Sequence, residues 1–218
     1  MTARLLLVRH GATVLAAEDR FAGSIDAPLS EEGRDQARAL GKRLAGEPLA
    51  AVYSSPSSRA VETARLVVAG RGLEPVVVPE LREIAHGRWE GSSREEVRAA
   101  WPEEYARWSH DPFTFAPEGG ETGLAVLARA LPALLAIVAR HPEATTLVVS
   151  HKATLRLLVG HFLGVELHGY RDKLDQSPCG LSVLEMRDGV GRLLLYNDVA
   201  HYATLPGPVG KRLSPWWA

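Results

Sequence analysis

Arginine and histidine side chains follow three apolar segments of the chain, at the point where each segment ends. Arg9 and His10 follow the first segment, Arg59 comes shortly after the second, and His151 follows the third. Because parallel strands present their carboxyl ends at one edge of a sheet, we expect these four side chains to meet there. Cations crowded together repel each other unless an anion binds between them, so the pattern predicts a site for a dianion such as phosphate.

The residue types at this predicted site suit phosphoryl transfer. An imidazole attacks phosphorus well when a hydrogen bond to its other nitrogen fixes the tautomer, so His10 is the candidate nucleophile. Arg9, Arg59 and a protonated His151 would neutralise the phosphoryl oxygens in the transition state. A departing alcohol needs a proton, and Glu83 is the candidate donor, because apolar surroundings can raise the pKa of a carboxyl group.

Composition narrows the class of protein. The 218 residues carry 25 basic and 26 acidic side chains, so a polybasic nucleic-acid binder is not expected. The single cysteine, Cys179, excludes an internal disulfide framework and a multi-cysteine metal site. The first apolar run is too short for a signal peptide, and no stretch is expected to approach the length of a membrane span. The sequence therefore predicts a cytoplasmic protein with neither nucleic-acid nor membrane partners.

Short apolar runs alternate with longer helical patterns along most of the chain. This alternation predicts an α/β fold, a three-layer sandwich in which helices cover both faces of a mostly parallel sheet. Two of the strands flank Asp188-Gly189, which predicts a hairpin or a sharp turn there. Strands are expected at 4–8, 49–54, 76–78, 145–149, 181–186 and 193–196, and helices at 29–45, 56–70, 124–140 and 151–163.

Two segments interrupt this rhythm. Residues 87–122 are rich in aromatic residues, proline and charge, and we expect a small helical insertion that lies over one end of the sheet as a lid. Its aromatic side chains are expected mainly to pack against each other. We assign 1–204 to one domain and 205–218 to a C-terminal tail that carries two terminal tryptophans.

Five short motifs lie along the chain in a definite order. They are Arg9-His10-Gly11-x-Thr13, Asp26-x-Pro28-Leu29-Ser30-x-x-Gly33-x-x-Gln36-Ala37, Ser54-Ser55-Pro56-x-x-Arg59-Ala60-x-x-Thr63-Ala64, Leu81-x-Glu83-Ile84-x-x-Gly87-x-Trp89-Glu90-Gly91 and Val148-Val149-Ser150-His151. In order and spacing they resemble the motifs of the histidine phosphatase superfamily, the phosphoglycerate-mutase-like fold. The resemblance covers nearly the whole chain up to about residue 200.

The resemblance implies a role for each matching residue. His10 would take the phosphoryl group as a phosphohistidine, while Arg9, Arg59 and His151 hold the phosphate. Glu83 would protonate the leaving group, and water would then hydrolyse the intermediate. A phosphatase of this kind needs no metal and no other cofactor.

Three positions depart from the family pattern. Ala16 stands where the family usually has asparagine, and Ala22 stands where glutamine often precedes the phosphate-site glycine, here Gly23. Both changes remove an amide that faces phosphate or substrate, which affects the substrate pose. Lys152 follows the second histidine where glycine is common; it is either an extra cation near the pocket or, as we favour, a solvated residue of the helix.

The segment after Glu83 is closer to the phosphatase branch than to the mutases, and part of it resembles metal-independent phosphoserine phosphatases. That resemblance implies that His86 and His201 lie close to a substrate carboxylate. We expect a phosphomonoesterase of broad specificity acting on small-molecule phosphate esters, phosphoserine among them. A cofactor-dependent phosphoglycerate mutase and a non-catalytic phospho-ligand binding module are the alternatives, and a homodimer is one option for assembly. The matching positions are Glu83-Ile84-x-His86-Gly87-x-Trp89, Glu95-Glu96-Val97, Trp108 and Gly119-Gly120-Glu121.

Overall fold

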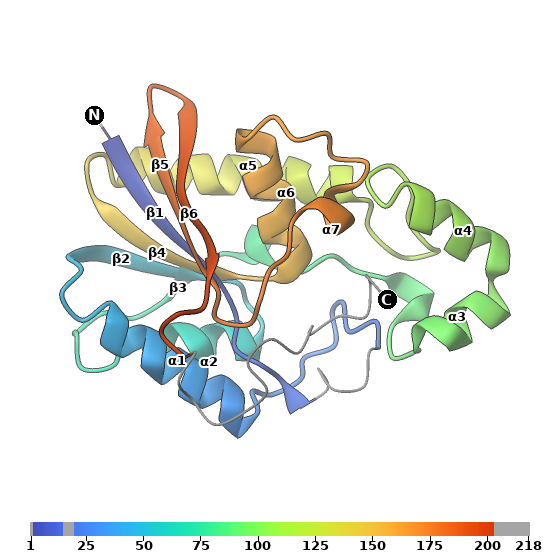
Figure 1. Ribbon diagram of the computed structural model, residues 1–218, viewed down its shortest axis with the longest axis horizontal. Helices are drawn as coiled ribbons and strands as arrows, with labels where there is room; N and C mark the ends of the chain where they lie inside the picture. The colour runs from blue at the N-terminus through green and yellow to red at the C-terminus, as the bar shows by residue number, and fades with distance from the viewer. Residues whose placement is uncertain (1, 15–19, 203–218) are drawn as a thin grey trace.

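A six-stranded mixed sheet forms the centre of the computed structural model, which describes residues 2–14 and 20–202 (Figure 1). Its strands are β1 (Thr2–Arg9), β2 (Leu49–Ser54), β3 (Val76–Val77), β4 (Thr145–Ser150), β5 (Leu181–Arg187) and β6 (Val190–Asp198). They are ordered β3-β2-β4-β1-β5-β6. The first four of these are mutually parallel, whereas β5 and β6 run antiparallel as a hairpin. The predicted fold class is confirmed, and β1 and β4 occupy its buried centre.

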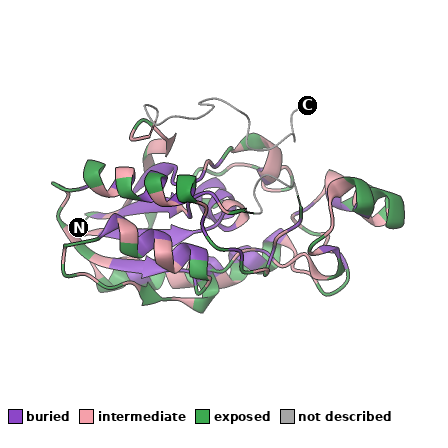
Figure 2. Cartoon of the chain, turned by 90° about the horizontal axis from the view of Figure 1, so that it is seen from below, coloured by how far each residue is buried: buried purple, intermediate pink, exposed green. Residues whose placement is uncertain are grey.

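Helices cover both faces of this sheet. On one face, α1 and α2 pack against apolar residues of β1, β2 and β4, and on the other face α5 and α6 do so (Figure 1). Figure 2 shows that the buried residues concentrate in the sheet and on the helix faces turned towards it. The helices are α1 (Glu31–Arg43), α2 (Ser58–Val67), α3 (Arg94–Ala100), α4 (Pro102–His110), α5 (Gly123–Arg140), α6 (Lys152–Phe162) and α7 (Tyr170–Lys173), with 3₁₀ turns η2 (Pro79–Leu81) and η3 (Gly87–Trp89).

Capping decides where the helices begin. The Ser30 hydroxyl accepts a hydrogen bond from the Gly33 N–H at 3.1 Å, so α1 starts one residue later, as expected for a serine cap. The predicted start of the second helix at Pro56 is wrong. The Ser55 N–H still pairs with the Val149 carbonyl at 3.0 Å, so the chain belongs to the sheet as far as Ser55. Helix α2 therefore begins only at Ser58.

Helix α5 corrects one expectation from the sequence. It spans 18 residues with a mean hydropathy of 1.8, so it is long and apolar enough to cross a membrane by length and composition. Such a helix is weak evidence for a membrane, because a core helix of a folded domain passes the same test. Its buried residues pack into the apolar core of the sheet, and they are Val126, Leu127, Ala130, Leu134 and Ile137.

The segment after η3 has a small apolar core of its own. Trp89, Val97 and Trp108 are buried together, with Trp101, Tyr105 and Phe115 packed around them. Phe21, from the chain between β1 and α1, completes this cluster, which joins that segment to the insertion. The expected mutual packing of the aromatics is confirmed except at Phe113, which packs against the main core instead. The predicted tail 205–218 and Ala16 lie outside the described residues.

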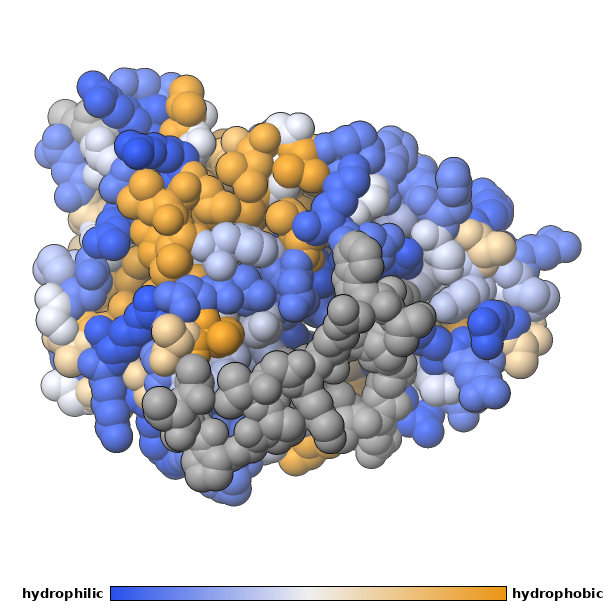
Figure 3. Space-filling view, viewed as in Figure 1, coloured by the Kyte–Doolittle hydropathy of each residue, from blue (hydrophilic) through white to orange (hydrophobic). Residues whose placement is uncertain are grey.

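Apolar side chains also gather on the face that carries the β5–β6 hairpin, as Figure 3 shows. On β6, Val190 and Leu194 are exposed, and β6 is the last strand at its edge of the sheet. A homodimer, like the division into domain and tail, stays a prediction.

Candidate active site

The carboxyl ends of β1 and β4 and the start of α2 border a pocket of about 210 Å³. Arg9, His10 and Arg59 line it, as the strand-end argument predicted, and so does Glu83, the candidate proton donor. The His151 ring lies directly beside the His10 ring, with centroids 5.1 Å apart. The five residues expected to carry the chemistry are therefore brought together.

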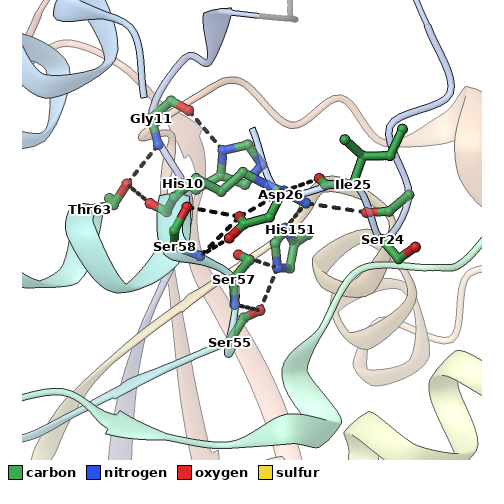
Figure 4. A network of polar contacts seen from close by, with 12 residues as sticks. His10, Gly11, Ser24, Ile25, Asp26, Ser55, Ser57, Ser58, Thr63 and His151 are labelled. Atoms are coloured by element: carbon green, nitrogen blue, oxygen red, sulfur yellow. Dashed lines mark hydrogen bonds and ion pairs between the residues drawn. The ribbon is translucent and has the colours of Figure 1, made fainter. Parts of the chain in front are cut away.

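The orientation of His10 is fixed by its neighbour. Its Nδ1 lies 2.8 Å from the Gly11 carbonyl oxygen, and the Gly11 N–H donates to the Thr63 hydroxyl at 3.0 Å (Figure 4). A carbonyl oxygen can only accept, so Nδ1 must carry the proton. The lone pair then resides on Nε2, which is the tautomer that a nucleophilic histidine requires.

The orientation of the His151 ring is fixed by two hydroxyl groups and by Arg59. Its Nε2 lies 2.6 Å from the Ser55 hydroxyl and 3.4 Å from the Ser57 hydroxyl, both on the segment that joins β2 to α2 (Figure 4). Its Nδ1 lies 3.4 Å from Arg59 Nη2. Because a guanidinium can only donate, this contact requires an unprotonated Nδ1.

The surroundings of both histidines disfavour the protonated form, because they lower the pKa of each ring. Burial lowers the pKa of His10 well below its ordinary value, and the charges of His151, Arg9 and Arg59 lower it further. Burial likewise lowers the pKa of His151, with Arg59 and Arg9 adding to the effect. The expectation of a protonated His151 concerns the transition state, and it stays a prediction. A phosphate dianion placed among these groups would favour protonation again.

The two arginines are anchored by backbone oxygens. Arg59 donates to the Ile25 carbonyl at 2.7 Å and to the Gly23 carbonyl at 3.3 Å, which places Gly23 at the pocket as predicted. Arg9 donates to the Gln176 carbonyl at 2.7 Å. Burial lowers the pKa of Arg9 to about 10, so it remains a cation at neutral pH.

The glycine bend is braced by a carboxylate. Gly23 has a φ of +46°, and a side chain there would meet the Glu90 carboxylate. That carboxylate accepts from the Ser24 N–H at 3.0 Å and from the His86 N–H at 2.9 Å. Glu90 thus ties the bend to the segment that carries His86.

Glu83 lies at the amino end of α6, and its contacts there decide the direction in which its pKa is shifted. Burial alone would raise the pKa of Glu83, but hydrogen bonds from the N–H groups of Ala153, Ile84 and Thr154 and the charge of Arg59 outweigh it. The net effect lowers the pKa below its ordinary value. The expected raised pKa is wrong, because backbone N–H groups and a guanidinium together stabilise the carboxylate more than burial disfavours it.

The two histidines expected near a substrate carboxylate are separated. His86 lines the pocket, with its ring centroid 4.9 Å from Phe21 and 6.0 Å from Trp108, and burial lowers its pKa. His201 is not among the residues that line the pocket; its Nδ1 lies 3.3 Å from Arg43 Nη1. The structure therefore brings only His86 to the site.

Sequence reasoning gave Lys152 as a pocket cation only as the less favoured alternative, and it missed Arg156 and three further arginines of the lining. Lys152 is half-buried in the lining, so the favoured interpretation as a solvated helix residue is wrong. Arg156 follows Lys152 by four residues, one helical turn, and that spacing was a signal in the sequence that could have found it. The further arginines of the lining are Arg20, Arg94 and Arg171.

The fold and this site define a phosphoryl-handling α/β protein, and comparison with known proteins gives the family. The chain belongs to the histidine phosphatase superfamily (branch 1), whose family model matches residues 5–199. Phosphoserine phosphatase 1 of Hydrogenobacter thermophilus is 33% identical over 198 residues, which are 91% of this chain and 93% of the relative.

Two further proteins extend this comparison. The adenosylcobalamin/alpha-ribazole phosphatase of Salmonella typhimurium is 34% identical over 160 residues, which are 73% of this chain and 79% of the relative. The solved structure of Bacillus stearothermophilus YhfR matches with a TM-score of 0.87 at 37% identity, covering 91% of this chain and 98% of that one. The chain is thus a phosphatase of this family.

Proposed function

We propose that the protein is a metal-independent phosphomonoesterase that hydrolyses small phosphate esters through a phosphohistidine at His10. One observation carries the proposal: the Nδ1–H of His10 is held by the Gly11 carbonyl, beside the buried Arg59 and the half-buried Arg9. The lone pair of Nε2 is free to attack where Arg9 and Arg59 attract a phosphate. The arginines supply the positive charge that a metal ion would otherwise supply.

The reaction has two steps. Nε2 of His10 attacks phosphorus, and the bond from phosphorus to the ester oxygen breaks as that oxygen takes a proton from Glu83. Water then attacks the phosphohistidine and gives a proton to the Glu83 carboxylate, while the bond from phosphorus to nitrogen breaks. Free phosphate leaves, and both side chains return to their starting states.

The carboxyl group must therefore gain a proton when substrate binds. A bound phosphate dianion raises the pKa of Glu83, since like charges disfavour two anions side by side. Equivalently, a monoanionic ester brings the proton with it. Both routes give the same total count of protons in the reactive complex.

Small esters that carry a carboxylate are the proposed substrates. The pocket is small, and seven of its twenty described lining residues are arginine or lysine, whereas Glu83 is the one acidic residue among them. The relative from Hydrogenobacter thermophilus, named a phosphoserine phosphatase, agrees with this class of substrate. Cytoplasmic location is part of the same proposal and rests on the sequence alone.

Release of phosphate from a panel of metabolites tests the proposal directly. The reaction with a ³²P-labelled ester is stopped rapidly without acid, and the label bound to the protein is measured. Label should be found on the wild-type protein and not on His10→Ala. Hydrolysis without a trapped phosphohistidine, under conditions that preserve the phosphorus–nitrogen bond, would contradict the mechanism. Strict dependence on a bisphosphorylated primer would instead indicate a mutase.

A further inference from the structure

The pocket holds more positive charge than one phosphate group needs. Arg9 and Arg59 already flank His10, yet Lys152 and Arg156 also line the same pocket. They are four residues apart on α6, so they project from the same side of this helix. A cation buried near other cations costs free energy unless a ligand compensates it.

These two cations are poorly compensated by the protein. Arg156 is only 5% exposed, and its one ion pair is a 3.4 Å contact with Asp175, whose side chain is 70% exposed. Within the described residues its buried Nε has no hydrogen-bond partner. Lys152 likewise forms no ion pair within the described part of the chain. A guanidinium fork with an unmet donor is suited to a carboxylate or phosphate oxygen.

The aromatic side of the pocket is a weaker candidate for this role. His86 is packed against Phe21 and Trp108, and burial lowers its pKa, so its ring is neutral at neutral pH. His201 lies against Arg43, away from the pocket lining. Neither imidazole therefore supplies positive charge for a second anion.

We infer that Lys152 and Arg156 form a distal anion site that binds a second negatively charged group of the substrate, a carboxylate or a second phosphate. The inference rests on the proposed function, because it assumes that the ester phosphate occupies the site of His10, Arg9 and Arg59. Lys152 is the specificity-determining residue of this pair, since Arg156 is partly engaged by Asp175.

Lys152 also gives the site a pH dependence that can be measured. Burial lowers the pKa of Lys152 to about 7, with Arg9 and Arg156 lowering it and Asp175 and Glu83 raising it. These four groups, from β1, α6 and two loops, are the charged groups with the largest effects on the pKa of Lys152. The ammonium is therefore present below pH 7 and lost above it, and the distal site should weaken as pH rises.

The test compares esters that differ only at the distal group. We expect kcat/KM for 3-phosphoglycerate to exceed that for glycerol 3-phosphate, with propane-1,3-diol bisphosphate as the arm that carries a second phosphate. Lys152→Gln should lower the preference for the charged esters by about tenfold, since it removes one charge-assisted bond. The matched control, Lys173→Gln, removes an exposed lysine that pairs with Glu166, and it should keep the wild-type preference.

Lys152→Arg provides a second readout. Arginine stays charged, so this variant should keep the preference from pH 6 to pH 8.5, whereas the wild-type preference should fall across pH 7. A wild-type protein that hydrolyses both esters equally, or Lys152→Gln with an unchanged preference, would overturn the distal site and leave the phosphatase proposal intact. If neither ester is hydrolysed, calorimetric binding of both to His10→Ala still tests the site: equal affinities would overturn it.

Discussion

The rings of His10 and His151 meet edge to face, with their centroids 5.1 Å apart and their planes inclined by 61°. One imidazole is fixed by the Gly11 carbonyl and the other by the Ser55 hydroxyl, so neither can turn away without losing a buried hydrogen bond. The pair therefore presents two preset nitrogens to a ligand, which is how a site avoids reorganisation during reaction.

His10→Ala should abolish turnover while leaving the fold intact, because the nucleophile is lost and the pocket merely gains space. We expect kcat to fall by at least about 10³-fold. Steady-state phosphate release and thermal unfolding of the purified variant check this. His161→Ala, an exposed histidine at the end of α6, is the control. Near wild-type turnover in His10→Ala would refute the role of the nucleophile.

Chelation should leave the activity unchanged. Among residues 2–14 and 20–202, no three histidine, cysteine or acidic side chains are grouped to hold a metal ion. The measurement is phosphate release after dialysis against EDTA, with and without Mg²⁺ or Zn²⁺ added back. Activity lost on dialysis and restored by one of these ions would contradict the proposed source of charge.

Glu83→Gln should harm alkyl phosphates far more than p-nitrophenyl phosphate. An alkoxide needs a proton in order to leave, whereas p-nitrophenolate is a stable anion that hardly needs one. We expect at least about a hundredfold larger loss of kcat/KM for the alkyl ester. Equal losses for both esters would assign Glu83 to binding rather than to proton transfer.

The pH dependence of kcat/KM should follow the protonation of the phosphate ester, because Glu83 itself carries no proton at neutral pH. Its pKa lies below the ordinary value, so the free carboxyl group is ionised at neutral pH and the proton arrives with the ester. The second pKa of a phosphate ester is about 6, so kcat/KM for alkyl esters should fall with rising pH above that value. Profiles for p-nitrophenyl phosphate should be flatter. A rise in kcat/KM for alkyl esters from pH 6 to 8 would contradict this account.

Replacing His86 and replacing His201 should have different effects on kcat/KM. His86→Ala removes a ring that packs between Phe21 and Trp108 at the pocket, so we expect kcat/KM to fall for all esters by a similar factor, about tenfold. His201→Ala should leave the preference among esters as it is, because His201 pairs with Arg43 outside the lining. Kinetics on 3-phosphoglycerate and glycerol 3-phosphate separate these outcomes. A selective loss of the carboxylate ester in either variant would restore the role implied by the family resemblance.

The sequence predicted the parts of this structure that depend on local pattern. Unbroken apolar runs predicted β1 and β4, and the polar residues that end them predicted the position of His10 and His151. The charge of Glu83 could not be predicted, because it depends on N–H groups of Ala153 and Thr154, contributed by a helix about seventy residues later. The same limit applies to His201, whose partner Arg43 is distant in the chain.

Helix boundaries could likewise be predicted only where the residues that fix them are close in the sequence. Ser30 was predictable as a cap because its partner, Gly33, lies three residues away. The start of α2 was not, since the Asp26 carboxylate that accepts the Ser58 N–H at 3.0 Å comes from the segment before α1. Contacts between distant segments decide such details, and a single sequence gives no direct sign of them.

Glu90 and Phe21 join the bend at Gly23 to the insertion: the carboxylate spans Ser24 and His86, and the phenyl ring lies in the insertion's own core. The bend beside Arg59 and the insertion over the pocket thus share one structural support. A graft of residues 87–122 from another family member would have to bring its own 20–26 segment with it. The geometry of the pocket therefore depends on two segments that lie far apart in the sequence but hold each other in place.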